Sequence, residues 1–424
     1  MRIGVNGFFL GQPTTGSGQY TENLLRELLR LDTENQYVLF SPSFQWSQVS
    51  LLNVAGSLFG GYDNEFKGFT EFAMPNSVNP RNSMSYCGKQ LEPVSKELDA
   101  HVLTTPFDSR SRNLAKLWFE QVSFPRACRR LDIDLAHVPY FASPLFPTAP
   151  TVVTVHDLIP LILPAYRGSL LVRLYTRLVA AAARKAEAII TVSQASERDI
   201  VRRLHIPPER IHVTYEAAGE AFRPVEDEAQ LIAIRRKYAL PERYLLYLGG
   251  FDRRKNLPGL LRAFALLVSR SRQARLVVAG KLPGLDSPMS PDPRRLVREL
   301  AVEESVVFTG WVSEEDKPSL LSGATAFVFP SLYEGFGLPP LEAMACGAPV
   351  VASNCSSLPE VVGQGGILVG PTDVEALAEA MEAILVDDAL RAKLRSRALA
   401  QAAKFSWKQT ALETLAVYRK VVGC

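Results

Sequence analysis

The chain has 424 residues, of which 47% are hydrophobic and 21% are charged, and its formal net charge at neutral pH is +3. This length exceeds one typical core and predicts two domains, and so small a net charge argues against a nucleic-acid-binding protein. Five cysteines without a CxxC pair make a poor disulfide framework, which favours a reducing cytoplasm. Because no apolar run reaches the roughly 18 residues that cross a bilayer, we expect a cytoplasmic protein, either soluble or peripheral at the inner membrane face.

The N-terminal part of the chain reads as a strand followed by a glycine-bearing turn. The predicted strand spans Arg2 to Val5, and Gly11, Gly16 and Gly18 precede a helix that begins near Gln19. Glycines before a helix suit a bound phosphate, and an ordinary flexible loop is the alternative. The turn lacks the GxGxxG fingerprint, which argues against a nicotinamide-dependent oxidoreductase.

The segment from Ser43 to Arg110 shows few sustained periods, and we interpret it as irregular loops over the acceptor side. A helix is predicted from Leu114 to Arg130. Beyond it, Asp132 and Asp134 look like a DxD metal motif. They precede a strand and so lie at the wrong end of a parallel sheet for a ligand, and we expect no metal site.

A strand is predicted from Thr151 to Val155. His156 and Asp157 follow at its carboxyl end, before a proline-rich turn. A lone histidine is more often structural than functional. At a strand end before a proline-rich turn, however, the structural and the functional interpretation are equally favoured. The next predicted helix, Ser169 to Ala186, carries two kinds of side chain on different faces: Arg173, Arg177 and Arg184 on one, and Leu171, Leu174 and Leu178 on another. The arginine face is either simply solvated or attracted to an anionic membrane or a phosphate-bearing acceptor.

Both periodicities break between Tyr215 and Pro224, where we place a domain boundary. Beyond it, short apolar runs alternate with helical patterns, which predicts a parallel sheet covered on both faces. The expected strands are Tyr244 to Leu248, Leu276 to Ala279, Val306 to Thr309, Ala326 to Phe329, Val350 to Ala352 and Ile367 to Val369.

Three consecutive cations, Arg253, Arg254 and Lys255, follow the first of these strands. They are unfavourable at a helix start unless an anion is present there, so the turn is a candidate diphosphate contact. Solvated surface charge is the alternative interpretation.

The stretch from Ala326 to Ser353 reads as a strand, a glycine turn, a short helix from Leu341 to Cys346 and a second strand. Backbone amides at the turn can point at an anion beyond the helix start, namely those of Gly335, Phe336, Gly337 and Leu338. Glu334 lies at the strand end and Glu342 in the first turn of the predicted helix. Carboxylates there suit hydroxyls on either side of a phosphate, such as a sugar and a ribose. Singly, each acid could instead serve the helix dipole or be solvated.

Glu334 and Glu342, within EGFGLPPLEAMACGAPVVAS, resemble the paired-glutamate motif of the retaining glycosyltransferases of family 4 (group 1). The resemblance covers most of the chain and implies an α/β fold of two facing Rossmann-like domains with a cleft between them, the GT-B architecture. It implies an acceptor-side domain at 1–218, a nucleotide-sugar donor domain at 219–405 and a helix at 406–424 that crosses back to the first domain. Trp407 and Tyr418 would then be core anchors.

The resemblance also implies roles for single residues. Gly16 would approach the donor diphosphate, His156 would contact the donor sugar, Glu334 would position that sugar and Glu342 would hold the ribose. Trp311 stands in a segment similar to the family's base-contacting one, and packing within the domain is the alternative role for it.

Lys255 matches the family's phosphate-binding lysine. Gly250 stands where many members have an arginine, and either Arg254 or Arg253 would replace that charge.

The implied reaction is transfer of a hexose from a nucleotide diphosphate sugar, with retention of configuration and without a metal or other cofactor. The segments HDLIP and GFGLPPLEAMACG are most similar to those of mannosyltransferases, so GDP-mannose is the favoured donor and a UDP-sugar is possible. The acceptor would be a glycan, a lipid-linked saccharide or a small molecule. The alternatives are a catalytically silent sugar-nucleotide-binding protein and an enzyme like the glycan phosphorylases.

Overall fold

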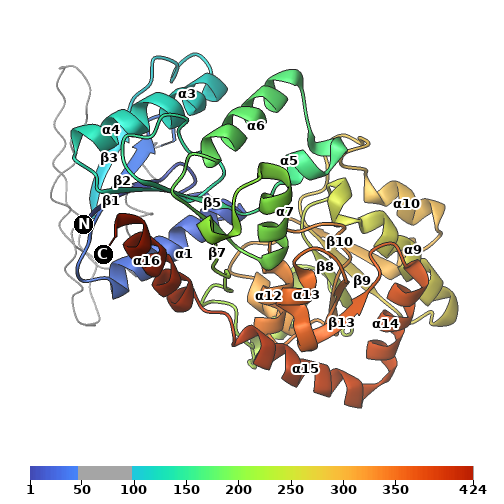
Figure 1. The fold of residues 1–424 in the computed structure, drawn as a ribbon. Helices are drawn as coiled ribbons and strands as arrows, with labels where there is room; N and C mark the ends of the chain where they lie inside the picture. The colour runs from blue at the N-terminus through green and yellow to red at the C-terminus, as the bar shows by residue number, and fades with distance from the viewer. Residues whose placement is uncertain (46–97, 424) are drawn as a thin grey trace, which may run out of the picture.

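The apolar runs predicted to be strands form two separate parallel sheets in the computed structural model, which describes residues 1–45 and 98–423 (Figure 1). Most of the segment that we interpreted as acceptor-side loops lies outside the described residues. The first sheet has, in spatial order, β3 (Asp99–Leu103), β2 (Gln36–Pro42), β1 (Arg2–Asn6), β4 (Leu135–Val138), β5 (Thr151–Val155), β6 (Ala188–Thr191) and β7 (Ile211–Val213).

The second sheet is also parallel throughout, and its central strands are buried on both faces. Its order is β10 (Val306–Gly310), β9 (Leu276–Ala279), β8 (Leu245–Leu248), β11 (Ala326–Phe329), β12 (Val350–Ser353) and β13 (Gly366–Val369). Central parallel strands need helices on both faces, and near-continuous apolar runs are their signature. The prediction of two Rossmann-like sheets is therefore confirmed.

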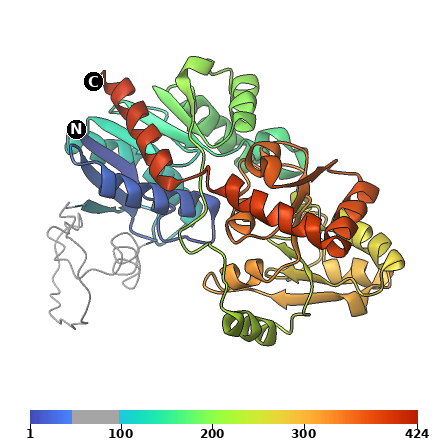
Figure 2. The same cartoon turned by 90° about the horizontal axis from the view of Figure 1, so that it is seen from below.

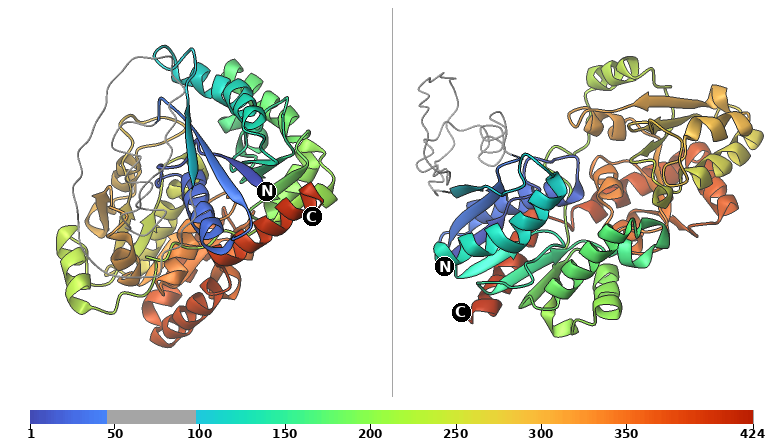
Figure 3. Two further views of the ribbon diagram at one scale, coloured as in Figure 1. Left: turned by 90° about the vertical axis from the view of Figure 1, so that its left-hand side faces the viewer. Right: turned by 90° about the horizontal axis from the view of Figure 1, so that it is seen from above.

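Helices surround each sheet, as Figures 1 and 3 show. Those around the first sheet include α1 (Gly16–Leu31), α3 (Arg112–Trp118), α4 (Phe124–Arg130), α5 (Ile159–Ile162), α6 (Leu170–Ala183) and α7 (Gln194–Leu204). Those around the second are α8 (Glu228–Lys237), α9 (Leu257–Arg270), α10 (Pro293–Glu299), α11 (Lys317–Ser322), α12 (Leu338–Ala345), α13 (Leu358–Val362), α14 (Val374–Val386) and α15 (Asp388–Ala402).

The last helix, α16 (Trp407–Val422), returns to the first sheet and runs beside α1 (Figures 1 and 2). The Tyr418 hydroxyl lies 2.5 Å from His137 Nδ1 inside the first core, and the Trp407 ring packs edge-on to Tyr20. Both Trp407 and Tyr418 are buried, as predicted for core anchors. The proposed domain limits at 218 and 405 fall in the connections before α8 and between α15 and α16.

Several predicted elements differ from the structure in their bounds or environment. The run from Leu114 to Arg130 contains a π-helical segment, Phe119–Ser123, between α3 and α4. Helix α12 begins at Leu338 rather than Leu341, because Pro339 and Pro340 are accommodated in its first turn. Glu342 therefore lies in the second turn of that helix and not in the first.

The leucines of α6 are exposed, which the sequence pattern did not indicate. Leu171 is 77% exposed and Leu174 is 50% exposed, and Arg173 and Arg177 are exposed beside them. The buried side of this helix consists of smaller residues, namely Thr176, Val179, Ala180, Ala182 and Ala183.

Candidate active site

A cavity of about 550 Å³ lies between the two sheets and is lined by residues of both halves. It opens at the carboxyl ends of the strands, where ligands of such sheets bind. The predicted residues that line it are Gly16, His156, Arg254, Lys255, Glu334, Gly335, Phe336, Gly337, Leu338 and Glu342. Every predicted site residue is thus in one cavity, although binding itself stays a prediction.

Glu334 lies at the centre of a cluster of charges on the donor-side wall. Its Oε1 is 2.8 Å from Lys255 Nζ, its Oε2 is 2.5 Å from Arg254 Nη1, and Ser331 Oγ donates to Oε1 at 2.6 Å. Burial alone would raise the pKa of Glu334, but Lys255 and Arg254 more than offset this, so its pKa lies below the usual range. The residue is an ionised carboxylate held between two cations.

The cluster forms because the two turns that carry it follow neighbouring strands. The basic turn, residues 250–255, follows β8, and the Glu334 turn, residues 331–337, follows β11, which pairs with β8. The side chain of Arg254 lines the cavity, whereas Arg253 is not among the lining residues. Of these two arginines, Arg254 is therefore the one that lies beside Lys255 in the cavity.

Glu342 reaches the same cavity from α12 but has a different environment. Its carboxyl is buried, and burial raises its pKa to about 8, with Lys317 acting in the opposite direction and Glu314 adding to the rise. Within the described residues no hydrogen bond to this carboxyl is seen. A carboxyl group in this position can form hydrogen bonds with hydroxyl groups of a ligand.

The turn between the two glutamates leads directly into the N-terminus of α12. Gly337 has φ of +125°, a conformation that side chains other than hydrogen rarely adopt, and it forms the N-cap of the helix. The first amides of any helix have no partner within it and carry a partial positive charge. In α12 only Leu338 can supply such an amide, because Pro339 and Pro340 have no amide hydrogen and the Leu341 amide already donates to the Gly337 carbonyl oxygen; Leu338 lines the cavity.

His156 lies on the opposite wall and has protein partners for both ring nitrogens. Its Nδ1 is 3.1 Å from Glu216 Oε1 and its Nε2 is 3.1 Å from the Pro139 carbonyl oxygen. Burial would lower the pKa of His156, but the hydrogen bond and charge of Glu216 outweigh burial and raise it. The predicted bond from this ring to a sugar would therefore require the ring to exchange its bond with Pro139.

The glycine turn before α1 forms the rim on the first-domain side. Helix α1 begins at Gly16, earlier than the predicted start near Gln19, and Thr15 caps it by accepting a hydrogen bond from the Gly18 amide at 3.0 Å. Gly16 has open space around its α-carbon and lines the cavity.

The cavity also has charged lining residues that were not predicted as site residues, among them Glu216, Lys281, Glu314 and Lys317. Glu216 follows β7 and supports His156, and Lys281, Glu314 and Lys317 lie near the end where Glu342 and Trp311 meet the cavity. Glu216 stands in YEAAGE directly after a strand, and that position is the only signal in the sequence that could have found it. Trp311 is 55% exposed and lines the cavity, so it is not a core residue.

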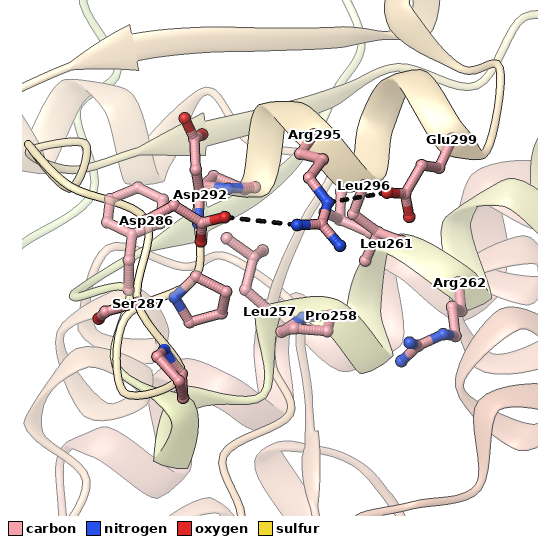
Figure 4. Close-up of a pocket in the computed structure, with 14 residues that line it drawn as sticks. Leu257, Pro258, Leu261, Arg262, Asp286, Ser287, Asp292, Arg295, Leu296 and Glu299 are labelled. Atoms are coloured by element: carbon pink, nitrogen blue, oxygen red, sulfur yellow. Dashed lines mark hydrogen bonds and ion pairs between the residues drawn. The ribbon is translucent and has the colours of Figure 1, made fainter.

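A second hollow of about 410 Å³ lies in the donor half between the start of α9, α10 and the loop at 286–292 (Figure 4). The Arg295 side chain crosses it between Asp286, at 3.5 Å, and Glu299, at 2.8 Å. These charges already pair with one another. Of the two cavities, the one between the halves has a central carboxylate beside two cations and the N-terminus of α12, so we identify it as the candidate active site.

No group of three or more His, Cys, Asp or Glu side chains in the described ranges is placed to hold a metal ion. Asp132 and Asp134 lie before β4, at the amino end of the first sheet and away from the cavity. The described helices include none with the length and apolarity needed to cross a membrane.

Comparison with known proteins places this site in a family. The model for glycosyl transferases group 1 matches residues 232–401, and the model for glycosyltransferase family 4 matches residues 85–217. O-antigen chain mannosyltransferase B of Escherichia coli is 37% identical over 269 residues, which are 63% of this chain and 70% of that protein. The chain belongs to this glycosyltransferase family. The prediction of an enzyme of the hexosyltransferase class is thereby confirmed.

Two further comparisons support the family and the fold, respectively. The serotype-specific mannosyltransferase WbdA of Escherichia coli is 37% identical over 271 residues, 62% of this chain, and the match spans 32% of WbdA. The structure of HepE from Anabaena in complex with UDP and glucose superposes with a TM-score of 0.71, at 17% identity, over 99% of this glycosyltransferase and 100% of that chain. The predicted GT-B architecture is confirmed by this likeness and by the two parallel sheets.

Proposed function

We propose that this glycosyltransferase moves a hexose, with mannose favoured, from a nucleoside diphosphate sugar to a hydroxyl of a glycan, a lipid-linked saccharide or a small molecule. The observation that carries the proposal is Glu334, which is held between Arg254 and Lys255 in the turn that precedes α12. A carboxylate alone would repel a diphosphate, whereas this cluster offers two cations and a helix N-terminus to it. The carboxylate is then left to accept hydrogen bonds from the sugar.

The donor would rearrange the cluster as it binds. A diphosphate takes over the cations of Lys255 and Arg254, and Glu334 turns from them to the sugar hydroxyls. When the bond between the sugar and the phosphate oxygen breaks, negative charge grows on the departing diphosphate. The same cations and the backbone amides from Gly335 to Leu338, in the turn that leads into α12, stabilise that charge, which is how preorganised donors lower a barrier.

We further propose that the acceptor oxygen bonds to the sugar carbon on the face from which the diphosphate leaves, so that configuration is retained. The acceptor hydroxyl proton passes to the departing phosphate oxygen, which balances the step without a protein nucleophile or a metal. Family membership supports retention, and the two cations beside Glu334 support a metal-free site.

GDP-mannose is the proposed donor, and a UDP-sugar is the second candidate. Two relatives from Escherichia coli are named as mannosyltransferases, and HepE, which shares the fold, was solved with UDP and glucose. The name of the first of these relatives, an O-antigen chain enzyme, supports a polysaccharide acceptor.

Calorimetry against GDP-, UDP- and ADP-sugars, followed by a transfer assay with the donor that binds, tests this function. Glu334→Ala should abolish transfer and leave the fold intact, while Glu379→Ala on the exposed face of α14 should leave transfer unchanged. Normal turnover in Glu334→Ala, or no binding of any sugar nucleotide by the wild type, contradicts the proposal. Transfer should also persist in EDTA; loss that a divalent ion restores would show that a metal is needed.

We also propose a cytoplasmic location with peripheral contact between α6 and the anionic inner face of a membrane. Leu170, Leu171 and Leu174 are exposed beside Arg173 and Arg177. The chain has no acid from residue 158 to residue 186. Exposed leucines flanked by cations match the chemistry of an anionic bilayer surface, where each cation contributes about 1 kcal/mol.

Sedimentation with vesicles tests this contact. Binding to vesicles that contain phosphatidylglycerol should fall on the order of tenfold in Leu171→Glu/Leu174→Glu. Leu285→Glu changes an equally exposed leucine in the donor half and should bind like the wild type. Equal binding of all three proteins would contradict a role for α6.

A further inference from the structure

The N-terminus of α7, which belongs to the first domain, touches the Glu334 turn of the second. Ser193 Oγ donates to the Gly335 carbonyl oxygen at 2.6 Å, and Ser196 Oγ lies 3.1 Å from the same oxygen and 2.9 Å from the His156 carbonyl oxygen. Both serines are buried. Two hydroxyls of one domain thus hold a single carbonyl of the other, and one of them also reaches the strand end that carries His156.

Gly335 is a glycine because of this close approach between domains. Its backbone does not have positive φ, yet an added Cβ would overlap the His156 carbonyl oxygen and would lie 3.0 Å from Asp157 Cβ. Within its own domain the turn is held by Ser356 Oγ, which accepts from the Glu334 amide at 2.9 Å, and by Ser357 Oγ, which donates to the Glu334 carbonyl at 3.0 Å. The donor domain alone therefore fixes one side of the turn, and α7 fixes the other.

A carboxylate of the second domain holds the same helix end in return. Glu360 on α13 accepts hydrogen bonds from the Gln194 and Ala195 amides, both at 2.8 Å. These are orphan amides at the positive end of α7, where an anion is favoured. The Tyr333 hydroxyl also donates to Asp199 Oδ2, one helical turn further along α7, at 2.6 Å.

We propose that Ser193 and Ser196 are positioning residues, which hold the Gly335 carbonyl, and with it Glu334, in place across the domain gap. Nucleotide contacts such as Lys255 and Glu342 belong to the donor domain alone. The geometry of Glu334 toward the reacting sugar is complete only when α7 is docked. This inference rests on the proposed sugar transfer, and it predicts that turnover depends on the serines more than nucleotide affinity does.

The test compares Ser193→Ala/Ser196→Ala with Ser169→Ala. Ser169 is also an N-cap, of α6, but its hydroxyl makes no interdomain contact within the described residues. Calorimetry with GDP and UDP, without a sugar, should give affinities within about threefold of wild type for both proteins, because the nucleotide contacts are untouched. Turnover of the donor sugar should fall on the order of 100-fold in the double variant only, as misplacement of a catalytic group by about 1 Å does.

Glu360→Gln provides a second arm that leaves the serines and Gly335 unchanged. It weakens the anion at the α7 N-terminus and should lower turnover in the same direction, again with GDP and UDP affinity preserved. Turnover in the double serine variant equal to that of Ser169→Ala would overturn the inference. So would an equal loss of nucleotide affinity and turnover, because the serines would then support binding and not position.

These failures differ from a failure of the proposed function. A wild-type protein that binds no nucleoside diphosphate and transfers no sugar would refute sugar transfer itself. A wild-type protein that is active, with a double serine variant that is equally active, would refute only the role of α7. Urea unfolding of each variant identifies any that has lost its fold, and for such a variant Glu360→Gln alone decides the outcome.

Discussion

Replacement of Glu342 by glutamine should stabilise the unliganded protein in a way that depends on pH. Burial raises the pKa of this carboxyl from 4.5 to about 8, so the folded protein resists its ionisation. Each pKa unit corresponds to about 1.4 kcal/mol, so at pH 7 the ionisation of Glu342 in the unfolded chain destabilises the fold by about 3 kcal/mol, and above pH 8 by about 5 kcal/mol. Below pH 4.5 the acid is neutral in both states and the difference vanishes.

Urea unfolding of wild type and Glu342→Gln at several pH values between 4.5 and 9 measures this difference. The side chain of the glutamine variant is uncharged, like the protonated acid. The free energy of unfolding of this variant relative to wild type should therefore increase as pH rises and reach a plateau above pH 8. Glu379→Gln alters an exposed glutamate of the same domain and should show no such trend. A stability difference that does not change with pH would refute the assignment of a buried, neutral carboxyl at 342.

The same reasoning predicts that nucleotide binding releases a proton. Ribose hydroxyls that donate to Glu342 favour its charged form and lower its pKa. Near pH 7, calorimetry in buffers of different ionisation enthalpy should therefore show release of about one proton in the wild type and none from this position in Glu342→Gln. Equal proton release in both proteins would place the ribose elsewhere.

Three further outcomes are expected. Lys255→Ala should lower kcat/KM by on the order of 100-fold in steady-state kinetics, because a charge-assisted bond to the diphosphate contributes about 2–3 kcal/mol; a loss below fivefold would contradict a phosphate contact. Tyr418→Phe leaves His137 Nδ1 without its partner and should cost about 1–3 kcal/mol in urea unfolding while nucleotide affinity is unchanged. Because the folded pKa of His156 is raised, its stabilisation is full below pH 6.5 and is lost as pH rises through the folded value; the stability gap between wild type and His156→Gln should narrow accordingly.

The parts of the site that follow strands could be predicted from the sequence. Glu334 and Lys255 each stand just after an apolar run, and in a parallel sheet all such positions meet at one edge. The sequence pattern could not show whether Arg253 or Arg254 lines the cavity. The directions of these side chains are set by a short 3₁₀ turn, residues 253–255, which the pattern does not reveal.

Contacts between the two domains have no signal in local sequence patterns. In the sequence, Ser193 looks like an ordinary helix cap and Glu360 like an ordinary surface acid. Each contacts the other domain, Ser193 at Gly335 and Glu360 at the N-terminus of α7, and these contacts depend on how the two domains dock. The exposure of the α6 leucines could not be predicted for a different reason. Leucines usually mark the buried face of an amphipathic helix, but here Thr176 and a row of alanines provide the close packing and leave Leu171 in solvent.

The return of α16 to the first sheet means that no single cut separates the two domains. A fragment that stops at residue 217 would expose the face of α1 on which α16 lies and would leave His137 without Tyr418. The donor half, in turn, would carry a helix whose buried Trp407 and Tyr418 have lost their site. Anyone who wishes to exchange donor domains between relatives must therefore insert the middle of one chain into another, with both ends of the host retained.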